Sequence, residues 1–99
     1  MNEVTVAKNL ANHLREIYRL AEYGASDEIT VMGKAKTAEH GYTSGDGATI
    51  LWEGGPMSRY GSPWTYDTSN EMLDWVQERY GNKFWLEAVN HWMLKVLKD

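Results

Sequence analysis

The chain has 99 residues and no cysteine, carries a formal net charge of −4, and contains five tryptophans and six tyrosines. A chain of this length has room for one hydrophobic core, so we expect a single domain over residues 1–99. The lack of cysteine excludes disulfides, thiolate zinc sites and cysteine nucleophiles. The ten basic residues are scattered rather than clustered, which argues against direct binding of nucleic acid.

The start of the chain has no apolar segment of the kind found in signal peptides, and no apolar run approaches the length of a membrane span. Together with the lack of cysteine, this pattern predicts a cytoplasmic protein with no membrane partner. The small acidic excess favours solubility.

The first predicted element is a helix over residues 4–23. Its apolar side chains recur at spacings of three and four and so form one stripe, made of Val6, Leu10, Leu14, Ile17 and Ala21. Gly24 follows as a residue that can end a helix in the left-handed conformation. His13 borders the stripe, and we expect it to be packed or half-exposed.

Two short strands are predicted next, over residues 28–32 and 48–53, and antiparallel pairing between them is the simplest topology. Residues 34–47 lie between them, contain three glycines and many small polar side chains, and are predicted to be a loop. Alternation in the second strand separates two faces, one with Ala48, Ile50 and Trp52, the other with Thr49, Leu51 and Glu53.

A second helix is predicted to begin at Thr68, which has the capping-box spacing with Glu71, and to end before Gly81. Leu14 of the first helix and Trp75 of this one are predicted to be core residues. Residues 82–97 fit two structures, because short apolar segments can have either period. They form either a helix or two strands, 84–88 and 92–96, with a turn near Asn90–His91.

No motif typical of an enzyme is found. The three histidines lack metal-binding spacing, and Ser58 does not lie in a nucleophile elbow. The glycine-rich residues 43–49 lack the Lys-Ser/Thr ending of a phosphate-binding loop. His40 beside Glu39 is the arrangement most suited to acid–base chemistry, but no partner for it is evident. We therefore expect a non-catalytic protein without metal or cofactor.

The segment ILWEGGPMSRYGSPWTY, residues 50–66, places aromatic side chains and an arginine in a predicted loop after the second strand. These residue types are common in the centres of protein interfaces. The loop is predicted to contact a partner or to fold back and fill the core, and both can hold in part, because Trp52 can be core while Arg59 and Tyr60 point outward. The predicted partner-binding residues are Glu53, Arg59, Tyr60, Trp64 and Tyr66.

Two segments, ATILWEGGP at 48–56 and FWLEAVNHW at 84–92, resemble a group of small uncharacterised proteins of tailed phages and haloarchaea. The insert MSRYGSPWTY departs from the pattern of the group, and so does Ala88–Val89. The resemblance favours strands over a helix in residues 82–97 and implies a viral or mobile-element origin, but it implies no activity. The shared residues are Trp52, Glu53, Gly55, Pro56, Glu87, Asn90 and Trp92.

These observations predict an α+β domain with a long N-terminal helix, a small antiparallel sheet, a second helix and a C-terminal segment that completes the domain. The leading hypothesis is a small acidic protein that binds and inhibits a host macromolecule, in the manner of a phage-encoded anti-CRISPR protein. Its partner would be a host protein or ribonucleoprotein complex, and a homodimer is compatible with it.

Three alternatives stay open from the sequence. The first is a small-molecule binder in which Trp52, Trp64 and Tyr66 stack on a nucleotide-like ligand. The second is a phage virion or packaging accessory protein. The third is a small enzyme that uses His40 with a carboxylate.

Overall fold

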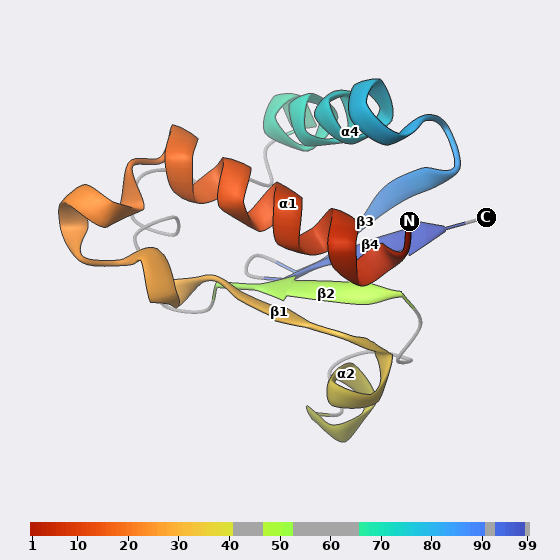
Figure 1. Cartoon of the computed structure of the whole chain (residues 1–99), viewed down its shortest axis with the longest axis horizontal. Coiled ribbons are helices and arrows are strands. Elements are labelled where there is room, and N and C mark those ends of the chain that lie inside the picture. Colours follow the sequence, from red (N-terminus) through yellow and green to blue (C-terminus); the bar gives the residue numbers. More distant parts are fainter. Residues whose placement is uncertain (41–46, 53–65, 91–92, 99) are drawn as a thin grey trace.

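The structure is a computed structural model that describes residues 1–40, 47–52, 66–90 and 93–98. Within these residues, two helices pack on one face of a four-stranded antiparallel sheet (Figure 1), which confirms the predicted α+β class. The strands lie in the order β1–β2–β4–β3. Their bounds are Thr30–Met32 for β1, Ala48–Leu51 for β2, Phe84–Asn90 for β3 and Met93–Lys98 for β4.

Helix α1 (Glu3–Ile17) begins with a side-chain cap and buries three members of the predicted apolar stripe, Val6, Leu10 and Leu14. The Asn2 Oδ1 atom accepts a hydrogen bond of 2.9 Å from the backbone N–H of Thr5, which satisfies one of the free donors of the first turn. The helix packs against β1, β2 and β4. Its buried side chains are Val6, Ala7, Leu10, Ala11 and Leu14.

The first helix ends earlier than predicted. Arg19 has φ +53°, in the left-handed region, and a 3₁₀ turn, η1 (Leu20–Tyr23), leads to Gly24 at φ +65°. This break buries Leu20 but leaves two members of the predicted stripe exposed, Ile17 with 54% exposure and Ala21 in η1. Apolar residues spaced by three or four positions occur both in a continuous helix and in a helix that is followed by a 3₁₀ turn. The spacing therefore could not predict the break.

Arg15 joins the end of α1 to the segment that leads into β1. Its Nε atom donates to the carbonyl oxygen of Ser26 at 2.7 Å, and its Nη2 atom donates to that of Ile29 at 2.8 Å. Ser26–Glu28 form a second 3₁₀ turn, η2, so β1 begins at Thr30 instead of residue 28. One guanidinium thus satisfies two backbone acceptors, one in η2 and one just before β1.

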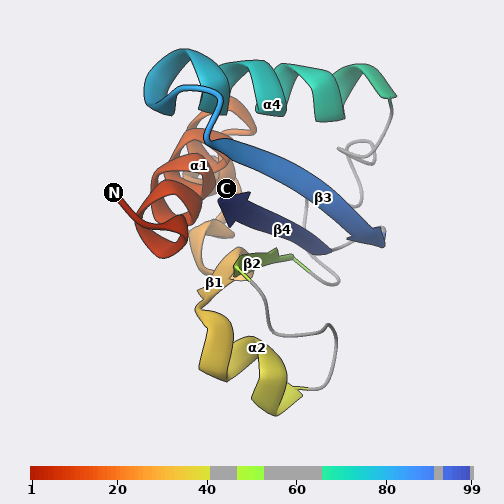
Figure 2. The ribbon, with the colours of Figure 1, turned by 90° about the vertical axis from the view of Figure 1, so that its right-hand side faces the viewer.

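Residues 34–40 form a helix, α2 (Lys34–His40), which contradicts the predicted loop over 34–47. The three glycines that favoured a loop all lie after His40, whereas KAKTAEH itself is made mainly of good helix formers. Averaging composition over fourteen residues therefore masked a short helical segment. α2 contacts β1 and β2, and Figure 2 shows it at the opposite end of the molecule from α4.

Helix α4 (Tyr66–Tyr80) has the predicted end but not the predicted start. Thr68 lies within the helix rather than at its cap, because no glycine or proline between Tyr66 and Thr68 opposes an N-terminal extension. At the other end, the N–H of Gly81 donates to the carbonyl oxygen of Gln77 at 2.9 Å, and Gly81 has φ +81°. This is the glycine-terminated helix end that the sequence predicts.

The C-terminal segment forms strands, so the helical alternative for residues 82–97 is wrong. β3 and β4 pair directly, with Leu86 opposite Val96 and a register shift between Ala88 and Asn90. β4 also pairs with β2, which places it inside the sheet. The buried residues that these strands and their ends contribute to the core under the helices are Ala48, Ile50, Trp52, Phe84, Leu94 and Val96.

The central strands are buried on both faces. Met93 and Lys95 alternate with Leu94 and Val96 along β4, yet all four are buried, Lys95 with only 5% exposure. Thr49, which lies opposite Lys95 on β2, is also fully buried. Along β2 and β4, side chains that point to either face of the sheet are therefore buried. The alternation of polar and apolar residues does not separate a core face from a solvent face here.

Candidate functional site

Most of the predicted partner-binding loop lies outside the described residues, so its role stays a prediction. Trp52 is described, and it is buried in the core with 1% exposure, which agrees with the core alternative for this residue. Tyr66 is the first residue of α4, although its side chain is not described. The predicted residues outside the described ranges are Glu53, Arg59, Tyr60 and Trp64.

The residues considered for metal binding or acid–base chemistry are not assembled in the described part of the chain. His13 lies on α1 and His40 ends α2, where its side chain is not described, while His91 is outside the described ranges. Among the described residues, no three histidine, aspartate or glutamate side chains gather in a metal-binding group. Nor do the described ranges contain a helix that combines the length and apolar content needed to cross a membrane.

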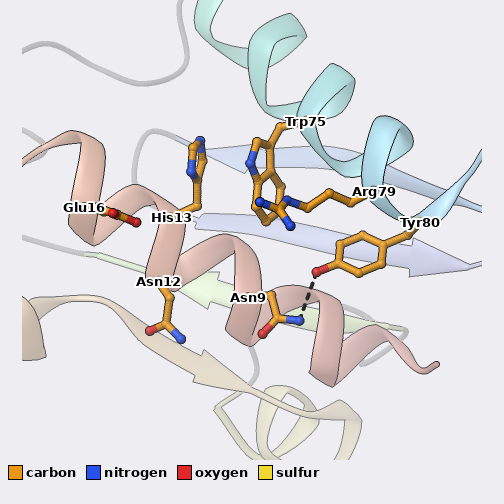
Figure 3. Close-up of a pocket in the computed structure, with 7 residues that line it drawn as sticks. All are labelled: Asn9, Asn12, His13, Glu16, Trp75, Arg79 and Tyr80. Atoms are coloured by element: carbon orange, nitrogen blue, oxygen red, sulfur yellow. Dashed lines mark hydrogen bonds between the residues drawn. The ribbon is translucent and has the colours of Figure 1, made fainter.

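A pocket of about 350 Å³ opens between α1 and α4 (Figure 3). The α1 residues that line it are spaced by three, one and three positions, which puts them on one face of the helix beside the buried stripe. The lining consists of Asn9, Asn12, His13 and Glu16 from α1 and of Trp75, Arg79 and Tyr80 from α4.

Stacked aromatic rings form the centre of this pocket. The rings of His13 and Trp75 lie 4.5 Å apart between centroids and within 16° of parallel, so the two helices meet through an aromatic stack. Tyr80 meets the Trp75 ring edge-on at 6.1 Å. Trp75 packs against the core but is only partly buried, so the prediction that it is a core residue holds for one part of its surface.

Arg79 is held against the same tryptophan. Its Cζ atom lies 4.7 Å from the Trp75 ring centroid, a cation–π contact made possible by the four-residue spacing on α4. Within the described residues, the guanidinium makes no hydrogen bond or ion pair. Its side chain is exposed, so its N–H donors are open to a ligand.

The amide and carboxylate side chains give the pocket polar walls. Asn9 Nδ2 donates a hydrogen bond of 2.9 Å to the Tyr80 hydroxyl oxygen and so joins α1 to α4. Asn12 Oδ1 accepts from Arg15 Nη1 at 2.7 Å, which orients this amide. Figure 3 shows Glu16 at one end of the row of side chains, beyond His13, and Arg79 against Trp75 in the middle, so the pocket has an anionic end and a cationic centre.

A smaller hollow of about 60 Å³ adjoins the pocket and shares His13 with it. Burial, reinforced by the charge of Glu71, raises the pKa of Tyr18 above its usual range. The exposed Ile17 side chain adds an apolar surface here. We call the pocket and this hollow together the α1/α4 groove; the hollow is lined by His13, Ile17, Tyr18, Glu71 and Met72.

The residues of this groove could have been found in the sequence from their helical spacing, although not from composition or motifs. Trp75 and Arg79 are four residues apart, and Asn9, Asn12, His13 and Glu16 follow helical spacing along α1. Each pattern is common on a solvated helix face. Only the packing of α4 next to α1 joins the two faces into one site.

No protein-family model matches the chain, and no curated protein or solved structure matches it.

Proposed function

We propose that the protein is a non-catalytic protein-binding domain whose contact surface includes the α1/α4 groove. The observation that carries this proposal is the partly exposed stack of His13, Trp75 and Arg79 between the two helices. Tryptophan, tyrosine and arginine are the residues that most often dominate binding energy in protein interfaces. Here they are already held in place by one another, which lowers the entropy lost when a partner binds.

A narrower form of the proposal is the inhibition of a host protein or ribonucleoprotein complex by a phage-encoded anti-defence protein of the anti-CRISPR type, acting in the host cytoplasm. Its support is the small acidic chain and the sequence resemblance to proteins of tailed phages. The predicted loop around Arg59 and Tyr60 would be a second contact surface of the same protein.

The burial of Trp52 bears on the alternative of a nucleotide-like ligand. That ligand was expected to stack on Trp52, Trp64 and Tyr66, but a ring with 1% exposure has no free face for stacking. A role in the virion or in packaging has no further support among the described residues.

Affinity capture tests the proposal directly. The wild-type chain and the double variant His13→Ala/Arg79→Ala are immobilised and exposed to lysate of cells that carry the gene, and captured proteins are identified by mass spectrometry. Lys36→Ala is the matched control, because this exposed lysine lies on α2, away from the groove. We expect a protein that wild type and Lys36→Ala retain and that the groove variant loses.

Melting curves of all three proteins show whether the groove variant is folded. A captured set that is the same for a folded groove variant and for wild type would contradict the proposal. A further variant, Arg59→Ala/Tyr60→Ala, then tells whether the predicted loop makes the contact instead.

A further inference from the structure

The cationic centre of the α1/α4 groove, at Arg79, combines the features of a carboxylate receptor. The Arg79 guanidinium is exposed, makes no ion pair within the described residues, and is stacked on Trp75. A guanidinium presents a planar fork of donors that matches the two oxygens of a carboxylate. Because the stack already restricts the Arg79 side chain, less entropy is lost when the fork binds an anion.

Two neighbouring side chains of the pocket have donors for the same anion. Asn9, drawn below Arg79 in Figure 3, uses one N–H for the Tyr80 hydroxyl and keeps a second. His13, in the centre of the pocket, makes no hydrogen bond within the described residues and can donate from a ring nitrogen. Hydrogen bonds from several donors to an ionised acceptor are about twice as strong as those between neutral groups.

The carboxylates at the anionic end of the groove favour a singly charged carboxylate ligand over a phosphoryl group. Glu16 lines the same pocket, Glu71 lines the adjoining hollow, and the whole chain carries a formal net charge of −4. A phosphoryl group carries a charge of about −1.5 to −2 at neutral pH and would be repelled more strongly by these carboxylates than a singly charged carboxylate would. The same two glutamates are placed to attract a cation that accompanies the carboxylate.

We infer that the α1/α4 groove binds a peptide segment of a partner protein through a carboxylate on Arg79, with a basic side chain of the same segment beside Glu16. The inference rests on the proposed function and adds the chemistry of the partner. Asn9 and Glu16 are separated by about 10 Å of helical rise. That rise is about the length of three residues of extended chain, so the test peptides place a carboxylate and a lysine two to three positions apart.

The carboxylate can belong to an acidic side chain or to the end of a chain, and two synthetic peptides distinguish these sources. The first is acetyl-Asp-Leu-Leu-Lys-amide, and the second is acetyl-Lys-Leu-Leu with a free terminal carboxylate. The control peptide is acetyl-Asn-Leu-Leu-Lys-amide, which keeps the shape of the first but lacks its carboxylate. Inorganic phosphate is the fourth probe.

Binding is followed by nuclear magnetic resonance of the ¹⁵N-labelled full chain, through the indole N–H of Trp75 and the Nε–H of Arg79. We expect saturable shifts of both signals with at least one carboxylate peptide, and binding weaker by at least about fivefold with the Asn peptide and with phosphate. The peptide that binds more tightly identifies the source of the carboxylate. Absence of saturable shifts up to about 10 mM of either carboxylate peptide would overturn the inference.

Three variants test the role assigned to Arg79. Arg79→Gln should lower the affinity for the carboxylate peptide by about tenfold or more. Arg79→Lys keeps the charge but not the planar fork of donors, so it should retain part of the affinity. Lys36→Gln removes the same charge far from the groove and should leave the affinity unchanged. Equal affinities of wild type and Arg79→Gln would show that Arg79 does not bind the carboxylate.

The peptide and capture experiments can fail independently. If capture depends on the groove but no carboxylate peptide binds, protein binding stands and its proposed chemistry is wrong. If the peptides bind at Arg79 but no captured protein depends on the groove, the pocket is a receptor for small carboxylates and the protein-binding proposal is wrong. If phosphate binds more tightly than either peptide, the pocket is a site for phosphoryl groups, and the inference of a carboxylate ligand is wrong.

Discussion

Asn9 and Tyr80, 71 positions apart in the chain, are joined by a hydrogen bond of 2.9 Å from Nδ2 to the hydroxyl oxygen. The bond ties the middle of α1 to the last residue of α4 at the edge of the groove. Because Asn9 is exposed, we expect a coupling energy of about 0.5–1 kcal/mol between these side chains. The measurement is a double-mutant cycle of Asn9→Ala and Tyr80→Phe in urea denaturation. Additive effects would show that the bond contributes nothing to stability.

The two apolar side chains Leu14 and Ile17, both on α1, should differ sharply in their contribution to stability. Leu14 is fully buried, so Leu14→Ala should lower the free energy of unfolding by about 2–5 kcal/mol. Ile17 is 54% exposed, and Ile17→Ala should change it by less than about 0.5 kcal/mol. Chemical denaturation measures both. Similar losses for the two variants would mean that the buried face of α1 is assigned wrongly.

Gly47 and Gly81 both have positive φ, but only Gly47 is crowded. A Cβ at Gly47, which precedes β2, would overlap the carbonyl oxygen of Val96 and come within 2.9 Å of a Leu97 methyl carbon. A Cβ at Gly81 would meet nothing within 4 Å. We expect Gly81→Ala to cost about 1 kcal/mol, the conformational penalty alone, and Gly47→Ala to cost more than about 2 kcal/mol. Thermal melting tests the order, and a reversed order would contradict the close approach of β2 to β4.

Stability should fall at alkaline pH because of Tyr18. Burial, then the charge of Glu71, raises the pKa of this phenol in the folded state above its ordinary value of 10.0. Below pH 10 the phenol is protonated in both states, and its contribution to stability is fully present. Above pH 10 the unfolded state loses the proton first, so this contribution is lost as pH rises through the folded pKa.

The alkaline effect is measured as the slope of unfolding free energy between pH 9 and pH 11 in wild type and in Tyr18→Phe. The variant should have the shallower slope. Glu71→Gln should lie between the two, because it removes the smaller cause of the shift and keeps the larger one. Equal slopes for wild type and Tyr18→Phe would assign the alkaline loss to other groups.

Periodicity predicted those parts of the fold that depend on one element at a time. It identified the buried face of α1 and placed Ala48, Ile50 and Trp52 together in the core. It could not give the order of the strands, because alternation tells which side chains share a face but not which strand lies beside which. β4 therefore gave no sign in sequence that it pairs with β2 as well as with β3.

The sequence was least informative where tertiary packing overrides local pattern. Lys95 and Thr49 are polar, yet they are buried on the central strands of the sheet, where an alternating pattern leads one to expect exposed side chains. In the groove, Trp75 has the spacing of a core residue, and only its stack with His13 reveals that it also forms a surface site. The predicted loop and the groove are both rich in aromatic and arginine side chains, but composition alone directed attention to the loop.

The position of β4 in the sheet sets the order in which this protein can fold during synthesis. β4 lies between β2 and β3, yet it follows both of them along the chain. A nascent chain that has emerged only as far as residue 90 has β1 and β2 on one side and β3 on the other, with no strand to join them. The apolar face of α1 then has only part of its sheet to cover it, so we expect the domain to fold in one late step governed by long-range pairing. A truncation before Met93 would remove the centre of the sheet and not its edge.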